Sequence, residues 1–209
     1  GFACAGVALA FMAATFALES RIEAARKAWR LPRWAVTAAG GLVVGAIAVA
    51  FPQVLGVGYE ATDEALHGRI AVGLMAALLV AKLAATVVTL ACGFGGGVFS
   101  PALTMGAMAG GVAGAAMQAL APGIASGPGA YVLVGMGAVA APVLGAPIST
   151  ILIVFELTRD YAVTLAAMVG VVTAGWAVDG AVGRSYFTWQ LARRGVVLEA
   201  EGPAARRAG

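Results

Sequence analysis

The feature that most constrains this sequence is a run of 73 residues, from Leu83 to Phe155, without a charged side chain. Soluble domains average roughly 25% charged residues, so a run of this kind belongs in a membrane. The run is interrupted at residues 95–101 by the sequence GGGVFSP, in which glycine breaks a helix and proline can start one. An unsatisfied backbone group is costly in hydrocarbon, so non-helical chain there must be packed in protein or line a watery cavity. We therefore interpret residues 95–101 as a candidate site.

The composition of the whole chain predicts an all-α integral membrane protein, because 61% of its residues are hydrophobic and only 11% are charged. The single histidine, His67, is expected to be a solvated side chain in an external loop. One histidine and ten acidic residues leave little material for a metal site or for acid–base catalysis, so we predict no enzyme activity, metal or cofactor. Cys4 and Cys92 lie in apolar surroundings and do not indicate a disulfide.

The net charge of +3 does not indicate a nucleic-acid partner, because the basic residues gather at two places. These are Arg21, Arg26, Lys27, Arg30 and Arg33 in one group, and Arg184, Arg193, Arg194, Arg206 and Arg207 in the other. Cytoplasmic loops carry an excess of Lys and Arg, so both groups and the C-terminus are predicted to be cytoplasmic, in a bacterial-type plasma membrane. The acidic residues Glu60, Asp63 and Glu64 are then external.

The apolar segments predict the path of the chain through the bilayer, which a helix of about 20 residues can cross. A loop in water is expected at residues 19–33, and prolines divide the uncharged run into pieces that imply short, tilted, broken or re-entrant helices. Residues 199–209 are predicted to be a disordered cytoplasmic tail. The expected membrane segments are residues 1–18, 34–55, 70–92, 102–120, 130–141, 148–157 and 161–181, followed by a short amphipathic helix at 185–194.

The chemistry of residues 97–101 points to an anion. Ser100 is a good N-cap and Pro101 suits the first helical position, so a helix is expected to begin here. A broken membrane helix places its N-terminus, which carries about half a positive charge, near the middle of the bilayer. The free amides there can hold a weakly hydrated anion such as chloride without the tight binding of a full positive side chain.

The sequence Gly97-Val98-Phe99-Ser100-Pro101 resembles the G-x-F-x-P signature of the CLC family of chloride channels and proton-coupled chloride exchangers. The resemblance implies that residues 1–198 are the C-terminal half of a pseudo-symmetric CLC-type transport domain, with the N-terminal half missing from this sequence. It also implies a homodimer with a separate pore in each subunit. Further matching segments are residues 52–59, 146–150, 155–158 and 191–195.

The resemblance also implies roles for single residues. The anion-binding residues are expected to be Gly97, Val98 and Phe99, with the amides of Val98 and Phe99 coordinating the anion. A tyrosine hydroxyl that contributes in the family is replaced here by Phe187, which cannot donate a hydrogen bond. Tyr186 is its neighbour but is turned about 100° away on a helix. We therefore expect a site made mainly of backbone amides, with weaker anion binding. The chain has no G-x-E-x-P pattern, so proton exchange and passive conduction both remain open.

Other residues receive more ordinary interpretations. Lys82 is expected to snorkel toward the cytoplasmic face or to line an inner vestibule, and Glu156 to have a structural or interfacial role. The G-x-G-x-x-A pattern at residues 135–140 lacks the strand of a dinucleotide site and is interpreted as close helix packing, as are Gly106, Gly110 and Gly114. The rival functions are a cation-coupled transporter with broken helices, a membrane enzyme and a structural membrane subunit.

Overall fold

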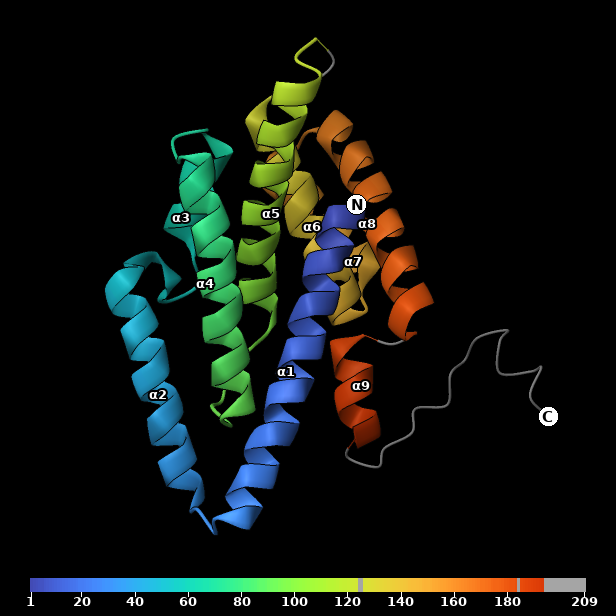
Figure 1. Ribbon diagram of the computed structural model, residues 1–209. Coiled ribbons are helices and arrows are strands. Elements are labelled where there is room, and N and C mark those ends of the chain that lie inside the picture. The colour runs from blue at the N-terminus through green and yellow to red at the C-terminus, as the bar shows by residue number, and fades with distance from the viewer. Residues whose placement is uncertain (124–125, 184, 194–209) are drawn as a thin grey trace, which may run out of the picture.

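The computed structural model describes residues 1–123, 126–183 and 185–193, and within them the chain is helical without a strand (Figure 1). This confirms the predicted all-α class. The predicted tail at 199–209, and the basic residues Arg184, Arg194, Arg206 and Arg207, lie outside the described residues. The helices are α1 (Phe2–Ala28), α2 (Arg33–Ala50), the 3-10 turn η1 (Pro52–Val54), α3 (Tyr59–Leu66), α4 (Val72–Ala91), α5 (Phe99–Leu120), α6 (Pro128–Leu144), α7 (Pro147–Thr158), α8 (Tyr161–Val182) and α9 (Tyr186–Arg193).

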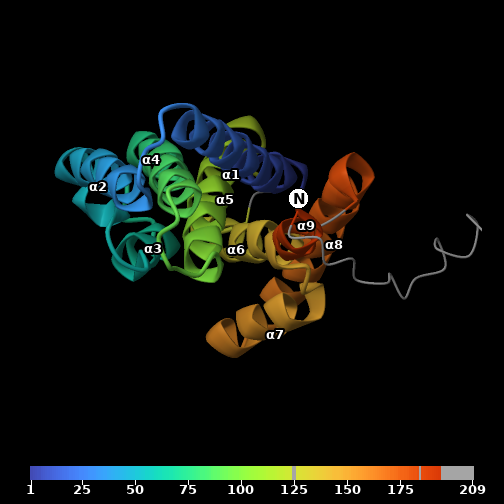
Figure 2. The ribbon, with the colours of Figure 1, turned by 90° about the horizontal axis from the view of Figure 1, so that it is seen from below.

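Five segments of the described chain are long and apolar enough to cross a membrane, namely α1, α2, α4, α5 and the segment that begins with α8. The shorter helices α6 and α7 are apolar as well. Few residues of α2 are buried, and Figure 2 shows this helix at the edge of the bundle. An apolar surface of this extent suits a chain that is surrounded by lipid or by further protein.

Three expectations about the path of the chain are wrong. Helix α1 continues to Ala28, where a loop in water was expected from residue 19. Residues 19–28 are rich in Ala, Glu and Arg, which favour helix, and Arg26 pairs with Glu23 one turn earlier. Helix α3 forms between the second and third expected spans, where no helix was predicted. Pro142 lies inside α6, which continues to Leu144; proline is tolerated within membrane helices where neighbouring groups satisfy the freed backbone carbonyl.

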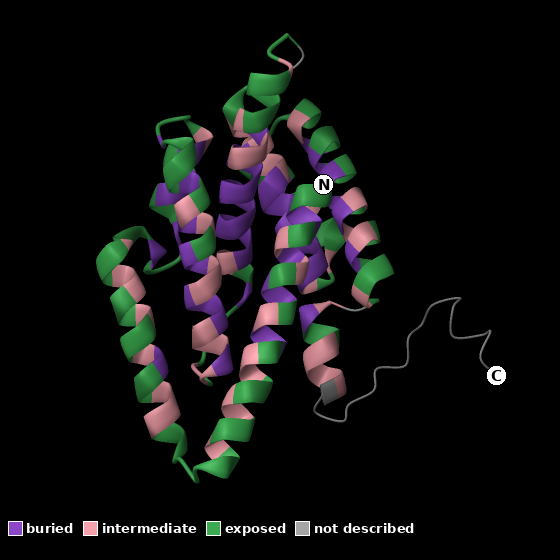
Figure 3. Cartoon of the chain, viewed as in Figure 1, coloured by how far each residue is buried: buried purple, intermediate pink, exposed green. Residues whose placement is uncertain are grey.

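The core is centred on α5 and α6, which carry the densest group of buried residues (Figure 3). A Cβ built on Gly110 would overlap the carbonyl oxygen of Tyr131, and one built on Gly114 would lie 2.7 Å from the side chain of the same residue. Gly106 and Gly135 approach each other equally closely. The interpretation of these glycines as contacts between packed helices is therefore confirmed, and the G-x-G-x-x-A pattern has a structural explanation.

Candidate anion site at the start of α5

The segment between α4 and α5 is the non-helical break that the glycines predict. Gly93 closes the end of α4 by donating to the carbonyl of Leu90 at 3.1 Å and has a φ of +80°, in the left-handed region that favours glycine. The chain is then irregular until α5 begins at Phe99. In Figure 1 the start of α5 lies higher in the view than the lower ends of α1 and α4. The break thus returns into the bundle before the new helix starts.

The amides at the start of α5 have no hydrogen-bond acceptor among the described residues. Val98 is the N-cap residue, and its carbonyl accepts the first helical hydrogen bond, from the amide of Ala102 at 3.1 Å. Within the described part of the chain, the amides of Gly97, Val98 and Phe99 have no backbone or side-chain acceptor. The Val98 side chain is buried, and that of Phe99 is 37% exposed. These amides therefore lie at the positive end of a 22-residue helix, with their donors unused.

Ser100 does not have the predicted role. Its hydroxyl does not cap α5 but donates to the carbonyl oxygen of Val57 at 2.9 Å, and the helix begins at Phe99. Pro101 is accordingly the third helical residue and not the first. The physical reason is that the Val57 carbonyl competes for the Ser100 hydroxyl, and it accepts from Ser100 and Thr104, both at 2.9 Å.

Lys82 also differs from the prediction, since it neither snorkels nor lines a vestibule. It is only 4% exposed, and its Nζ donates to the carbonyl oxygens of Val54 and Gly56, both at 2.8 Å. The end of η1 and the turn after it direct these carbonyls into the bundle, so the ammonium group finds partners without reaching water. Sequence reasoning missed this contact, although one unpaired lysine in an apolar helix is a signal that a partner must exist.

The two aromatic residues at the start of α9 have different surroundings. Tyr186 is 4% exposed and stacks on Phe16 of α1, with ring centroids 5.3 Å apart. Phe187 is 42% exposed and meets Tyr186 edge-on. In Figure 1 the starts of α9 and α5 lie at similar heights, near the middle of the view, and the ring contacts of Tyr186 join α9 to α1. Tyr186 is thus held against α1, and Phe187 is the more accessible of the two.

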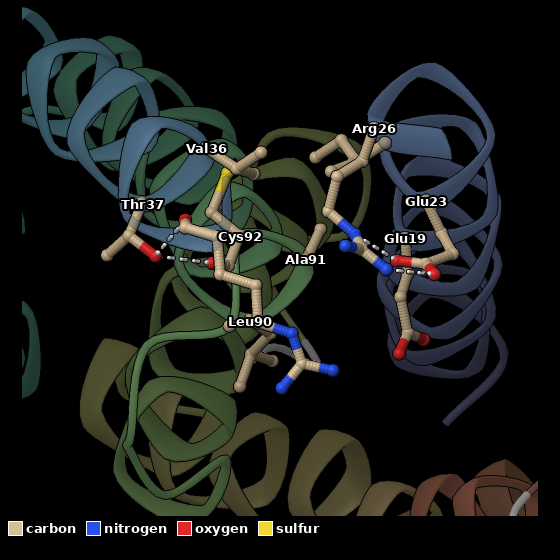
Figure 4. A pocket seen from close by; sticks show the side chains of 11 residues that line it. Glu19, Glu23, Arg26, Val36, Thr37, Leu90, Ala91 and Cys92 are labelled. Carbon is tan, nitrogen blue, oxygen red and sulfur yellow. Dashed lines mark hydrogen bonds and ion pairs between the residues drawn. The ribbon is translucent and has the colours of Figure 1, made fainter. Parts of the chain in front are cut away.

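A pocket of about 420 Å³ opens beside the break, between α1, α2 and the end of α4 (Figure 4). Its charged lining consists of Glu19, Glu23 and Arg26 of α1 together with Arg33 of α2. Arg26 donates to both carboxylate oxygens of Glu23, at 2.9 and 2.7 Å. Sequence reasoning missed this pocket because it took residues 19–33 for a loop, although Glu19 and Glu23 have the spacing that places side chains on one helix face.

The far wall of this pocket is formed by α2 and the end of α4. Thr37 donates to the Cys92 carbonyl at 3.1 Å and fixes α2 to the end of α4. Burial raises the pKa of the Cys92 thiol, which therefore stays protonated at neutral pH. Gly93 also lines the pocket, so a charged and open space reaches the first residue of the break.

The remaining polar candidates lie away from the start of α5. His67 ends α3 with its ring exposed and its Nδ1 2.8 Å from the carbonyl oxygen of Asp63. Glu156 is exposed in the last turns of α7. Within the described residues, no group of three His, Cys, Asp or Glu side chains could hold a metal ion.

This chain is similar to known proteins both in its sequence and in its fold. The profile of the voltage-gated chloride channel family matches residues 1–179. A ClcB-like chloride channel protein of Ralstonia nicotianae is 40% identical over 82% of this chain and 41% of its own length. Chloride channel protein CLC-f of Arabidopsis thaliana is 34% identical, covering 84% of this chain and 24% of the relative.

Two further proteins extend the comparison. The H⁺/Cl⁻ exchange transporter ClcA of Vibrio vulnificus is 33% identical over 60% of this chain and 27% of its own length. The crystal structure of a slow cyanobacterial Cl⁻/H⁺ antiporter superimposes with a TM-score of 0.75 and 23% identity, covering 92% of this chain and 46% of that protein, which shows the same fold. The chain thus spans less than half the length of these relatives.

Proposed function

Because this chain belongs to the voltage-gated chloride channel family, we propose that it forms half of a membrane domain that transports chloride or a similar small anion. The observation that carries the proposal is the start of α5, where the amides of Gly97, Val98 and Phe99 follow a glycine-rich break and have no acceptor within the described residues. Such amides at the positive end of a helix form a ready anion site.

The physical properties of this site suit transport. Backbone amides carry partial charges, so they hold an anion less tightly than a lysine or arginine would, and a permeating ion must also be able to leave. The charged side chains nearby, Glu19, Glu23, Arg26 and Arg33, line the pocket that reaches Gly93. That pocket offers an anion an open approach from one side of the membrane to the break. A cation-coupled transporter would instead need carboxylates or unwound carbonyls directed at the ion.

We propose the following arrangement in the membrane. These regions, and the pocket beside the break, face the cytoplasm across the plasma membrane; the basic residues between the first two spans and after the last one support this orientation. The protein works as a homodimer, with the missing N-terminal half completing each pore. Relatives named as chloride channels and as H⁺/Cl⁻ exchange transporters both occur among the similar proteins, so passive conduction and proton exchange are alternatives within one function.

The test removes one amide without removing the helix. Val98→Pro in the full-length protein deletes the Val98 donor, and the preceding Gly97, without a Cβ, tolerates a following proline better than other residues. We expect chloride affinity, measured by calorimetry in detergent, to fall about tenfold, since a hydrogen bond to a charged partner contributes about 1.5–3 kcal/mol. Val98→Ala loses the same buried side chain but keeps the amide, and is the matched control. Equal chloride affinity in the two variants would contradict the proposal.

A further inference from the structure

We propose that Lys82 is a positioning residue for the anion site. It acts through residues 54–58, named here the bridging loop. This loop lies between α2 and α3 in the sequence and is hydrogen-bonded both to α4 and to the first turn of α5. The inference rests on the proposed function, since it assigns a second layer of support to the same amides. Lys82 contacts the loop and not the anion.

The contact of Lys82 with the bridging loop is strong for a side chain inside a membrane helix. An ammonium group in hydrocarbon is costly and must be satisfied by hydrogen bonds or counter-charges. Within the described residues Lys82 has no carboxylate partner, and its Nζ is bound by the carbonyls of Val54 and Gly56, each at 2.8 Å. The charged group cannot leave these carbonyls without being buried unsatisfied, so it fixes the loop to α4.

The backbone of the bridging loop lets it face two helices at once. Gly56 has a φ of +66° and Gly58 a φ of +82°, both in the left-handed region that favours glycine. The Val54 and Gly56 carbonyls accept from Lys82 of α4, while the next carbonyl along the chain, that of Val57, accepts from Ser100 and Thr104 of α5. One short segment thus connects a fixed charge on α4 to the first turns of α5.

The second half of this connection reaches the anion site directly. Ser100 follows Val98 and Phe99 in the same helical turn, so a displacement of the Val57 carbonyl moves the turn that carries the free amides. The backbone of Gly58 also lies close to Thr104, because a Cβ built on Gly58 would be only 2.6 Å from the Thr104 hydroxyl oxygen. The position of the amides therefore depends on Lys82, which lies on another helix.

The experiment measures chloride binding by calorimetry in the full-length protein. Lys82→Met should weaken chloride binding on the order of tenfold. Removing a group that orients the residues in contact with a metal ion has an effect of this size on metal affinity. Lys82→Arg keeps a charged donor and should restore most of the affinity. Thr89→Val, which removes a hydrogen bond within α4 at Ala85 but no contact with the loop, is the matched control and should bind as the parent does. A Lys82→Met protein with the parent affinity would overturn the inference.

A second variant tests the path of the effect and does not depend on how well Lys82→Met folds. The double variant Ser100→Ala, Thr104→Val frees the Val57 carbonyl from α5. Without any change at Lys82, it should already weaken chloride binding. Combined with Lys82→Met, it should add little further loss, because both changes break one connection. Full additivity would show that Lys82 acts by another route and overturn the inference. If the parent protein binds no chloride, the proposed function itself fails, which is a different result.

Discussion

The backbone of Gly106 in α5 lies so close to that of Gly135 in α6 that a Cβ built on either would overlap the carbonyl oxygen of the other. Both contacts are with backbone, which cannot rotate away as a side chain does. This crossing fixes α5 against α6 along the part of α5 that follows the free amides. The glycines thus contribute to the site by holding the helix that carries it.

Gly135→Ala is therefore expected to destabilise the protein by about 1–3 kcal/mol, the usual cost of forcing extra volume into a packed core. Thermal unfolding of the purified protein in detergent measures the effect. Gly45→Ala is the matched control, because a Cβ at Gly45 meets no atom of the chain within 4 Å, and it should unfold at or slightly above the parent temperature, since Ala favours a helix more than Gly does. An equal shift in both variants would mean that α5 and α6 are not in close contact.

Phe187→Tyr is expected to tighten chloride binding. Phe187 stands where the resemblance implies a tyrosine donor, and it is 42% exposed, whereas Tyr186 is stacked on Phe16 and turned toward α1. The new hydroxyl can donate to an anion, and a hydrogen bond to a charged group contributes about 1.5–3 kcal/mol, or about tenfold or more in affinity. Calorimetric titration of the full-length protein with chloride measures it.

The control for that change is Phe155→Tyr, since Phe155 is 41% exposed on α7 and gains the same hydroxyl away from α9. It should leave chloride affinity unchanged. If Phe187→Tyr gives no gain either, the start of α9 does not face the anion, and the amides of α5 act without it.

The membrane helices could be predicted from the sequence because the length of an apolar run is a local property. The segments expected at residues 70–92, 148–157 and 161–181 match α4, α7 and α8 within two residues at each end. The extension of α1 could not be read in this way, because hydropathy marks where a helix leaves the lipid and not where it ends. Helix propensity and the Glu23–Arg26 pair determine the end of α1.

The candidate site was only partly predictable, for a related reason. The break and the helix start could be inferred from Gly97 and Pro101, whose backbone preferences act within a few residues. The partners of Ser100 and Lys82 lie 43 and 26 to 28 residues away, and only the packing of helices brings them together. Capping rules therefore gave the wrong role for Ser100, because a distant carbonyl competed for its hydroxyl.

The last prediction concerns Asp160, which caps α8. Its Oδ1 accepts hydrogen bonds from the amides of Ala162 at 2.8 Å and Val163 at 3.2 Å, and its charge lies at the positive end of the helix. Asp160→Ala should lower the free energy of unfolding by about 1 kcal/mol, measured by thermal unfolding in detergent. Asp160→Asn keeps the acceptor oxygen and loses only the charge, so it should recover most of that stability. If both variants unfold like the parent, the tight turn between α7 and α8 is held by helix packing and not by this cap.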